Sequence, residues 1–371
     1  MRDNKLERMV NEAIRCFQFK GTFHDMRKYG NGHINDTFLV RFIDDKGKKT
    51  KYILQRINSN VFKKPAEVMS NIIKVTEHLK KAIVAHDGDP ERETLTVIKT
   101  KSGKGYYIDG YGYCWRAFIF IADAVSLDLP EDDNDFYQSA VAFGNFQKML
   151  GDFPASELYE TIPNFHNTPK RYENFLASLE KNASGRKDTA LEEIEFVNKR
   201  KDFMSILEDS YKEGKLPLKV THNDTKMNNV MLDKDTREPV CVVDLDTIMP
   251  GYSVNDFGDS IRFGASTAAE DEKDLSKVHF DIKLFETYTR GFLKGCGGTL
   301  TQGEIDLLPA GAKMMTLECG MRFLTDYIDG DTYFKTAYPE HNLARCRTQF
   351  RLVEEMEEHW DEMQAIVQKY K

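Results

Sequence analysis

The most informative residues form a loop, His222–Asn229, which reads His-Asn-Asp-Thr-Lys-Met-Asn-Asn. An apolar run follows it and ends at Asp244, 20 residues after Asp224. Phosphoryl transfer from ATP requires a carboxylate that accepts the proton of the acceptor hydroxyl, and hard oxygen ligands for the Mg²⁺ ions on the phosphates. These residue types at this spacing therefore indicate phosphoryl transfer that depends on ATP and Mg²⁺.

Three residues carry the expected chemistry, and we expect all three to be catalytic. Asp224 suits the role of base, while Asn229 and Asp244, on the two arms of a predicted hairpin, suit the role of metal ligands. We expect His222 to brace the loop through hydrogen bonds rather than to transfer protons.

Two further aspartates lie near the motif. Asp256-Phe257-Gly258 spells the tripeptide that binds metal in protein kinases, but no apolar strand precedes it. The surrounding segment, residues 250–264, predicts instead a turn that enters a helix, so we expect Asp256 to support the site without binding the metal. Asp246 leaves two interpretations open: a second metal ligand, or an exposed carboxylate that caps the next turn.

Residues that could approach the nucleotide phosphates lie early in the chain. Gly30 and Gly32 belong to a turn whose backbone N–H groups could reach phosphate oxygens, although an ordinary hairpin turn is the alternative. A later strand ends in Gln55 and Arg56 where a phosphate-binding lysine is expected, so either Arg56 or Gln55 substitutes for it or other groups neutralise the α- and β-phosphates. Glu67 is either a partner of Arg56 or a solvent-exposed residue of the next helix.

The elements that must position these residues begin with a helix, because the apolar residues between Leu6 and Phe17 share one helical face. A strand-rich region with one helix follows. Its patterns predict strands at residues 37–42, 51–57, 94–100, 106–108 and 115–121, and a helix that starts at Pro65. The first two strands are expected to form a hairpin.

Beyond residue 134 helical patterns dominate. They predict helices at residues 136–150, 170–179 and 190–211 and again toward the C-terminus, with an island of strands at residues 220–246. The sequence therefore predicts an α+β fold with a small β-rich N-terminal lobe (residues 1–121), a linker (122–134) and a larger, mainly helical C-terminal lobe (135–371).

Composition excludes several classes of protein. The 371 residues carry 52 Lys and Arg against 60 Asp and Glu, a net charge of −8, which argues against non-specific binding of nucleic acid. Residues 114–125 form the most apolar stretch, but Arg116 and Asp123 interrupt it, so we expect no membrane span. The six cysteines lack Cys-x-x-Cys spacing, which argues against a zinc site. We expect a cytoplasmic protein whose partners are ATP and a small-molecule substrate; the oligomeric state stays open.

Five segments carry a more specific pattern. They are YGNGHINDTFLV (29–40), HNDTKMNN (222–229), VVDLDTIMPG (242–251), DFGDSIRFGAS (256–266) and LECGMRFLTDYIDGDTYFK (317–335). Together they resemble the N-acetylhexosamine 1-kinases, a family of the aminoglycoside phosphotransferase/choline kinase group with a protein-kinase-like two-lobe fold. The resemblance implies phosphorylation of the anomeric hydroxyl of N-acetylglucosamine or N-acetylgalactosamine by ATP and Mg²⁺; the choice between the two sugars stays open.

The resemblance also implies the residues that bind the acceptor. Asp224 would contact the acceptor as the base, and Phe263, Arg322 and Tyr333 would line the sugar pocket. Without the resemblance, the simpler interpretations are an ion pair between Arg322 and Glu318 one helical turn apart, and interior positions for Phe263 and Tyr333.

Two other functions fit the same residues. One keeps the chemistry and changes the acceptor to an aminoglycoside, choline or another small alcohol. The other is a non-catalytic nucleotide-binding module, a pseudokinase, because the strand lysine is missing. The presence of Asp224, Asn229 and Asp244 together favours an active enzyme.

Overall fold

The computed structural model describes residues 2–30 and 34–371, and the chain divides into two compact units. We call them the N-terminal unit (residues 1–125, 156–162 and 240–249) and the C-terminal unit (residues 126–155, 163–239 and 250–371). The first contains an antiparallel sheet and the second is mainly helical, so the predicted α+β fold is confirmed. The chain returns twice to the N-terminal unit, and its second return brings Asp244 there.

A five-stranded antiparallel sheet, of order β1-β2-β3-β5-β4, forms the frame of the N-terminal unit. Its strands are β1 (Thr22–Lys28), β2 (Asp36–Ile43), β3 (Lys49–Arg56), β4 (Tyr107–Ile108) and β5 (Cys114–Ile119). Strands β2 and β3 pair from Asp36 opposite Arg56 to Ile43 opposite Lys49, which confirms the predicted hairpin. On the other side of β3, Gln55 lies opposite Arg116 of β5.

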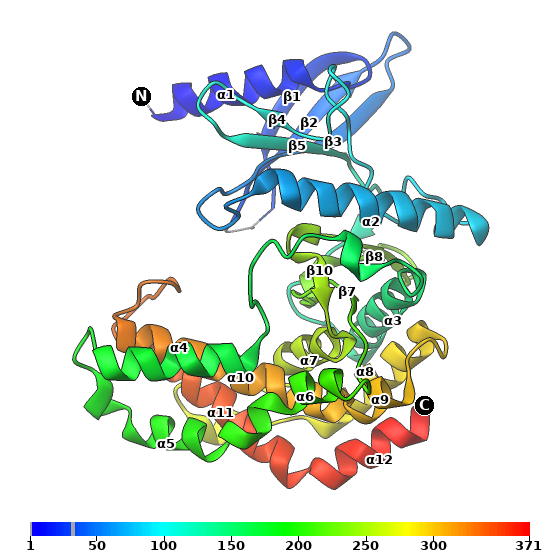
Figure 1. Ribbon diagram of the computed structural model, residues 1–371. Helices are drawn as coiled ribbons and strands as arrows, with labels where there is room; N and C mark the ends of the chain where they lie inside the picture. The colour runs from blue at the N-terminus through cyan, green and yellow to red at the C-terminus, as the bar shows by residue number, and fades with distance from the viewer. Residues whose placement is uncertain (1, 31–33) are drawn as a thin grey trace. The chain divides into compact units, whose positions relative to one another are not determined.

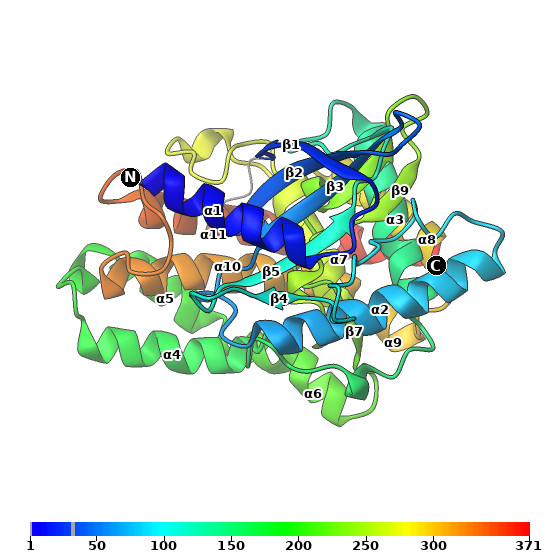
Figure 2. The same cartoon turned by 90° about the horizontal axis from the view of Figure 1, so that it is seen from above.

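Helix α1 (Arg2–Cys16) lies across one face of this sheet (Figures 1 and 2). Its buried side chains and those of the strands form one apolar core, which contains Met9, Val10, Ala13, Ile14, Phe38, Val40, Tyr52, Leu54, Trp115 and Ala117. Every second residue of a strand faces the same side of the sheet, which is why the apolar face of α1 finds a continuous partner. The predicted N-terminal helix is confirmed.

Helix α2 (Pro65–Ala85) begins at Pro65, as predicted, because the first residue of a helix needs no partner for its N–H group. Its buried Asn71 binds both segments that return to this unit. Nδ2 of Asn71 donates to the carbonyls of Tyr159 (2.8 Å) and Ile248 (2.9 Å), and its Oδ1 accepts from the N–H of Tyr159. One amide therefore fixes the segment that follows Asp244.

Two details of this unit differ from the prediction. Residues 94–100 contribute isolated bridges at Val97 and Thr100 rather than a strand, because Thr100 closes a tight turn by donating its N–H to the carbonyl of Lys104. Strand β1 was not predicted, because it is an edge strand whose largely polar residues show no alternation.

The C-terminal unit is built around helix α10, which packs beside α4 in both views (Figures 1 and 2). Its helices are α3 (Asp133–Met149), α4 (Thr168–Lys181), α5 (Leu191–Lys199), α6 (Ile206–Lys212), α7 (Ser253–Gly264), α8 (Ile282–Cys296), α9 (Gln302–Asp306), α10 (Leu308–Asp329), α11 (His341–Glu358) and α12 (Trp360–Tyr370). The helix predicted at 190–211 is split by a 3₁₀ turn, η3 (Lys201–Ser205). No helix within residues 2–30 and 34–371 is long and apolar enough to span a bilayer.

The predicted catalytic residues follow short strands, and β7 (Lys219–Thr221), β8 (Val230–Asp233) and β9 (Pro239–Val242) confirm the predicted island of strands. Two further short strands are β6 (Ala124–Val125) and β10 (Met249–Gly251). The loop between β7 and β8 contains Asp224 and ends in a 3₁₀ turn, η4 (Met227–Asn229). Beyond β8 the chain turns back through Asp233, whose N–H donates to the carbonyl of Glu238 (2.8 Å), and β9 then leads to Asp244.

Candidate active site

The loop that follows β7 presents Asp224 to solvent, with 30% of its side chain exposed. Asn223, just before it, has a left-handed backbone (φ 64°), which Asn tolerates better than most residues. Nδ2 of Asn229 donates to the backbone carbonyl of Asp224 (2.8 Å) and to its Oδ2 (3.3 Å), and Nζ of Lys226 lies 3.2 Å from the same Oδ2. The structure thus brings the predicted base and one predicted metal ligand, Asn229, into direct contact.

Asp256 supports this loop from the first turn of α7. Its carboxylate accepts hydrogen bonds from the N–H groups of His222 (2.8 Å) and Asn223 (2.7 Å) and from Nε2 of Gln147 (2.8 Å). Burial raises the pKa of Asp256, against the lowering effect of His222 and of these donors. These contacts give Asp256 the structural position that the sequence predicted for it.

The other two residues of the Asp-Phe-Gly tripeptide also have structural explanations. Phe257 is fully buried, and a Cβ added at Gly258 would collide with the backbone of Gly311 in α10. Glycine at position 258 therefore permits the close approach of α7 to α10. A metal-binding role is not needed to explain any residue of the tripeptide.

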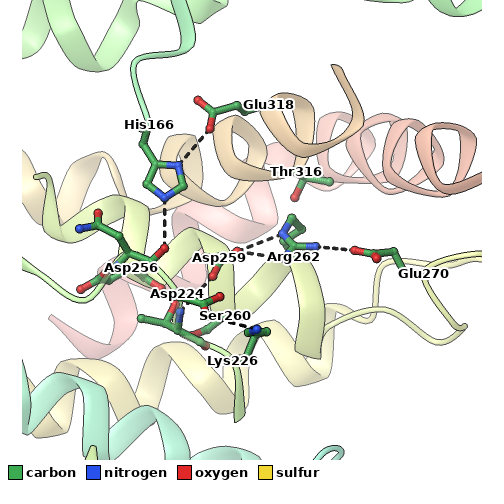
Figure 3. Close-up of polar contacts among 12 residues, drawn as sticks. His166, Asp224, Lys226, Asp256, Asp259, Ser260, Arg262, Glu270, Thr316 and Glu318 are labelled. Atoms are coloured by element: carbon green, nitrogen blue, oxygen red, sulfur yellow. Dashed lines mark hydrogen bonds and ion pairs between the residues drawn. The ribbon is translucent and has the colours of Figure 1, made fainter. Parts of the chain in front are cut away.

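A buried ion-pair chain that starts one turn further along α7 also binds the loop (Figure 3). Oδ2 of Asp259 accepts from the N–H of Thr225 (3.0 Å), and its Oδ1 lies 3.0 Å from Arg262, which also binds Glu270 (3.0 Å). Burial of Asp259 opposes its ionisation, but the charges of Arg262 and His166 and the hydrogen bond from Arg262 together outweigh burial and lower the pKa of Asp259. The sequence analysis did not single out Asp259, although Asp and Arg at i,i+3 on a helix are a recognisable signal.

Asp244 stands at the start of a 3₁₀ turn, η5 (Leu245–Thr247), in the N-terminal unit. Its backbone is left-handed (φ 59°), a conformation that costs free energy for a residue other than glycine and is concentrated at functional sites. This geometry supports the prediction of a functional role for Asp244.

Of the two interpretations that the sequence left open for Asp246, the exposed carboxylate was wrong. Its side chain is 4% exposed, and it forms an ion pair with Arg116, which is 2% exposed. Its other oxygen accepts from Nδ2 of Asn35 (2.7 Å). Both oxygens of Asp246 are thus used inside the unit, because an unpaired carboxylate at this depth would be very costly.

Arg116 is the residue of the N-terminal unit that the sequence analysis missed. Besides its ion pair, its Nε donates to Oε1 of Gln55 (2.9 Å), its partner across the β3–β5 ladder. Burial opposes the charged form of Arg116, but the charge of Asp246 and its hydrogen bond outweigh this and raise the pKa. An arginine within the apolar strand Cys114–Ile119 is a signal of a buried cation with a buried partner.

The predicted nucleotide-binding residues have mixed outcomes. Gly30 has a positive φ (73°) in the turn before β2, and open space surrounds the position of an added Cβ; Gly32 lies outside the described residues. Arg56 forms an ion pair with Asp36 and lies 4.7 Å from the ring centre of Tyr113. The suggested pairing of Arg56 with Glu67 was wrong, because Glu67 instead binds Lys64 in the first turn of α2 (3.0 Å).

A pocket of about 240 Å³ in the C-terminal unit includes two of the three predicted sugar-binding residues, Arg322 and Tyr333. Its lining residues come from α4, α10 and the segment after α10: Arg171, Asn174, Ser178, Met321, Arg322, Thr325, Asp326, Asp329, Thr332, Tyr333 and Phe334. The guanidinium of Arg322 lies 5.9 Å from the ring centre of Tyr333 and 5.6 Å from that of Phe334.

The third predicted residue, Phe263, lies elsewhere. It borders a much smaller pocket, of about 10 Å³, together with Thr225 and Met227 of the catalytic loop. The simpler interpretation of Arg322 as an ion-pair partner of Glu318 was wrong: Glu318 accepts from Nδ1 of His166 (3.0 Å) and from Oγ1 of Thr168 (2.6 Å). Arg322 therefore faces the pocket with aromatic rings around its guanidinium.

Comparison with known proteins identifies the family. The model of the family described as "Phosphotransferase enzyme family" matches residues 25–286, more than half of the chain. The protein belongs to this family. The match includes the loop of residues 222–229, Asp244 and Asp256, so it covers the residues that the sequence pattern selected. The narrower resemblance to N-acetylhexosamine 1-kinases stays a prediction.

Solved structures of several other proteins share the fold over nearly the whole chain. A microcompartment-associated aminopropanol kinase is 14% identical, covers 96% of this chain and 98% of its own, and has a TM-score of 0.62. An aminoglycoside phosphotransferase from Alicyclobacillus acidocaldarius is 11% identical (97% and 96% covered, TM-score 0.60). An amicoumacin kinase in complex with AMP-PNP, Ca²⁺ and amicoumacin is 14% identical (94% and 95% covered, TM-score 0.56). The likeness confirms the predicted protein-kinase-like fold of this phosphotransferase.

Proposed function

We propose that this phosphotransferase transfers the γ-phosphoryl group of ATP to the anomeric hydroxyl of an N-acetylhexosamine and forms the sugar 1-phosphate. The pocket that contains Arg322 and Tyr333 carries the proposal, because the resemblance assigns these residues to the sugar and they line one cavity. The amicoumacin kinase, solved with AMP-PNP, supports ATP as the donor. A cytoplasmic location, where ATP is available, is part of the proposal.

The donor groups fit Mg²⁺ that is shared with the nucleotide. Within residues 2–30 and 34–371, no three His, Cys, Asp or Glu side chains gather into a metal site. Mg²⁺ in kinases is held by one or two protein oxygens together with phosphate oxygens, and the amide oxygen of Asn229 and the carboxylate of Asp244 are each a ligand of the kind that Mg²⁺ takes. Since Nδ2 of Asn229 is bonded to Asp224, its Oδ1 is the atom that would meet the ion. When bound, Mg²⁺ neutralises charge on the β- and γ-phosphates.

The chain's own residues then supply the proton transfer. Asp224 accepts the proton of the anomeric hydroxyl while that oxygen forms a bond to the γ-phosphorus. The bond between this phosphorus and the bridging oxygen breaks, and ADP leaves with that oxygen. An anomeric hydroxyl is more acidic than other sugar hydroxyls because the ring oxygen withdraws charge, so one carboxylate is an adequate base. No phosphoenzyme is involved.

The charges of the pocket favour a neutral acceptor over a polycation. Arg171 and Arg322 both line it, and burial together with the charge of Arg322 lowers the pKa of Arg171. The carboxylate of Asp326 accepts from the N–H groups of Tyr333 (2.8 Å) and Phe334 (2.9 Å), and that of Asp329 from the hydroxyl of Ser178 (3.0 Å). A cationic acceptor would therefore face two arginines and carboxylates that already have partners.

A second candidate keeps the chemistry and changes the acceptor. Two of the similar structures are named for an amino alcohol and an aminoglycoside, so phosphorylation of such a compound is the alternative. The third possibility, a pseudokinase, would bind ATP without turnover.

A screen for ATP consumption and product formation tests the proposal. The acceptors are hexoses, N-acetylhexosamines, their 1-O-methyl glycosides, kanamycin, choline and 1-amino-2-propanol. We expect turnover with an N-acetylhexosamine and none with the methyl glycosides, which lack a free anomeric hydroxyl. Arg322→Ala is expected to lower kcat/KM for the sugar by an amount that corresponds to about 1–3 kcal/mol of lost transition-state stabilisation, with little change in KM for ATP. Turnover of the methyl glycosides, or of choline alone, would reject the 1-kinase assignment.

A further inference from the structure

A buried histidine outside all the predicted motifs touches the peptide that carries the proposed base. His166 lies just before α4, and its side chain is only 8% exposed. Its Nδ1 lies 3.0 Å from Oε1 of Glu318, and its Nε2 lies 3.3 Å from the backbone carbonyl oxygen of Asn223 (Figure 3). The imidazole thus joins α10 to the residue directly before Asp224.

The two partners decide the protonation state of this ring. The carbonyl of Asn223 can only accept a hydrogen bond, and the ionised carboxylate of Glu318 can only accept as well. A neutral imidazole carries one N–H group and could satisfy only one of them, with a lone pair facing the other oxygen. Both contacts are hydrogen bonds only if His166 carries two protons and a positive charge.

The contacts around Glu318 favour its ionised carboxylate. Burial of Glu318, which is 1% exposed, opposes its charge, but the hydrogen bond from His166 and the charges of His166 and Arg322 outweigh it and lower the pKa of Glu318. The hydroxyl of Thr168 donates to the second oxygen. The charged groups that interact with this pair are Arg322 on α10, Asp259 on α7 and Arg171 on α4, and Asp224 and Asp256 lie next to the contacted peptide.

The peptide between Asn223 and Asp224 is held at both of its polar atoms. Its carbonyl accepts from His166, and its N–H group, that of Asp224, donates to Nδ1 of the buried His222 (3.3 Å). This peptide follows the left-handed Asn223, a backbone state that persists only where the surroundings enforce it. The direction in which the side chain of Asp224 points depends on the orientation of this peptide plane.

We propose that His166, held as an imidazolium by Glu318, is a positioning residue that fixes the peptide of Asp224 and thereby the direction of the base. The inference rests on the proposed function only in treating Asp224 as the base; the identity of the acceptor does not enter. Glu318 lies one turn of α10 before Arg322, which lines the pocket of the C-terminal unit.

The first test is independent of activity. In the full-length protein labelled with ¹⁵N-histidine, His166→Asn identifies the signals of His166 among the nine histidines. At pH 7 we expect both ring nitrogens of His166 to show the chemical shifts of protonated nitrogens. The shifts of a neutral tautomer would overturn the proposal, whatever the enzyme phosphorylates.

The second test is kinetic and uses a matched control. His279 makes the same two kinds of contact, with Oε1 of Glu355 (2.9 Å) and the carbonyl of Ser276 (3.0 Å), but it belongs to neither the catalytic loop nor the pocket. With the acceptor that the screen identifies, we expect His166→Asn to lower kcat roughly 10- to 100-fold at unchanged KM for ATP, as for a misplaced catalytic group. His279→Asn should leave both constants as in the wild type.

The outcomes separate the two proposals. If the wild type turns over no acceptor, the proposed function fails, and the nitrogen shifts alone decide the role of His166. A His166→Asn variant that melts like the wild type and keeps its kcat would overturn the positioning role. Glu318→Gln gives a second variant: it should return His166 to a neutral ring, and an imidazolium that persists in it would contradict the assignment of Glu318.

Discussion

Replacing Arg116 with methionine removes one partner of the most deeply buried ion pair of the N-terminal unit. Arg116 and Asp246 are 2% and 4% exposed, so the variant leaves a carboxylate in the interior whose remaining donor, among the described residues, is Asn35. Loss of one partner from such a pair costs about 3–5 kcal/mol. At roughly 2–4 °C per kcal/mol for a domain of this size, the melting temperature of the unit should fall by about 6–20 °C.

Scanning calorimetry with and without Mg²⁺ and ATP measures this effect, because the two units can melt in separate transitions. Arg56→Met is the matched control: its partner Asp36 is 39% exposed, and exposed pairs contribute only about 0–1 kcal/mol. The double variant Arg116→Met/Asp246→Leu should recover most of the loss, since no buried charge is left unpaired. If Arg116→Met lowers the melting temperature no more than Arg56→Met does, burial does not determine how much the ion pair contributes to stability.

The other predictions concern the catalytic loop and one surface pair. Asp224→Asn should keep the fold and nucleotide binding while kcat falls roughly 10²–10⁴-fold, and a near-normal kcat would remove Asp224 from the role of base. Asp244→Ala should weaken binding of Mg²⁺–ATP and nearly abolish turnover, whereas Asp256→Ala should lower the melting temperature by freeing two N–H groups of the loop. Anomalous scattering from Mn²⁺ at Asp256 would contradict this division. The hydrogen bond that His279 donates to Glu355 raises the pKa of His279, so this pair stabilises the fold fully below about pH 6.5 and less as the pH rises through the raised pKa. The difference in melting temperature between the wild type and His279→Asn should therefore shrink with rising pH, and a difference that grows would refute the pairing.

Local patterns predicted the elements well where one residue or one periodicity dominates. Pro65 marked the start of α2, and the alternation in β2 and β3 predicted their hairpin. The spacing of Asp224, Asn229 and Asp244 selected the hairpin that carries them, and the family match extends over it. The edge strand β1 escaped prediction because an edge faces solvent and needs no apolar alternation.

The supporting residues could not be predicted, because their partners lie far away in the sequence. Arg116 meets Asp246 across 130 residues, and His166 meets Glu318 across 152. A sequence shows that such a charge sits in an apolar segment, but it does not show which opposite charge the fold brings to it. The predicted ion pair between Arg322 and Glu318 was wrong for this reason. The sequence shows that the two residues lie one helical turn apart, but it does not show that the fold brings His166 to Glu318.

The discontinuity of the N-terminal unit has a consequence for how this enzyme can be divided. A fragment that ends at residue 125 lacks residues 156–162 and 240–249, which Asn71 binds in the intact chain. It would also leave Arg116 without Asp246, a buried cation with no counter-charge. A chimaera with a relative, made by one crossover near residue 125, would join the sheet of one protein to the Asp244 segment of the other. Exchange of the whole N-terminal unit therefore requires that residues 156–162 and 240–249 travel with residues 1–125, so a single crossover cannot exchange it.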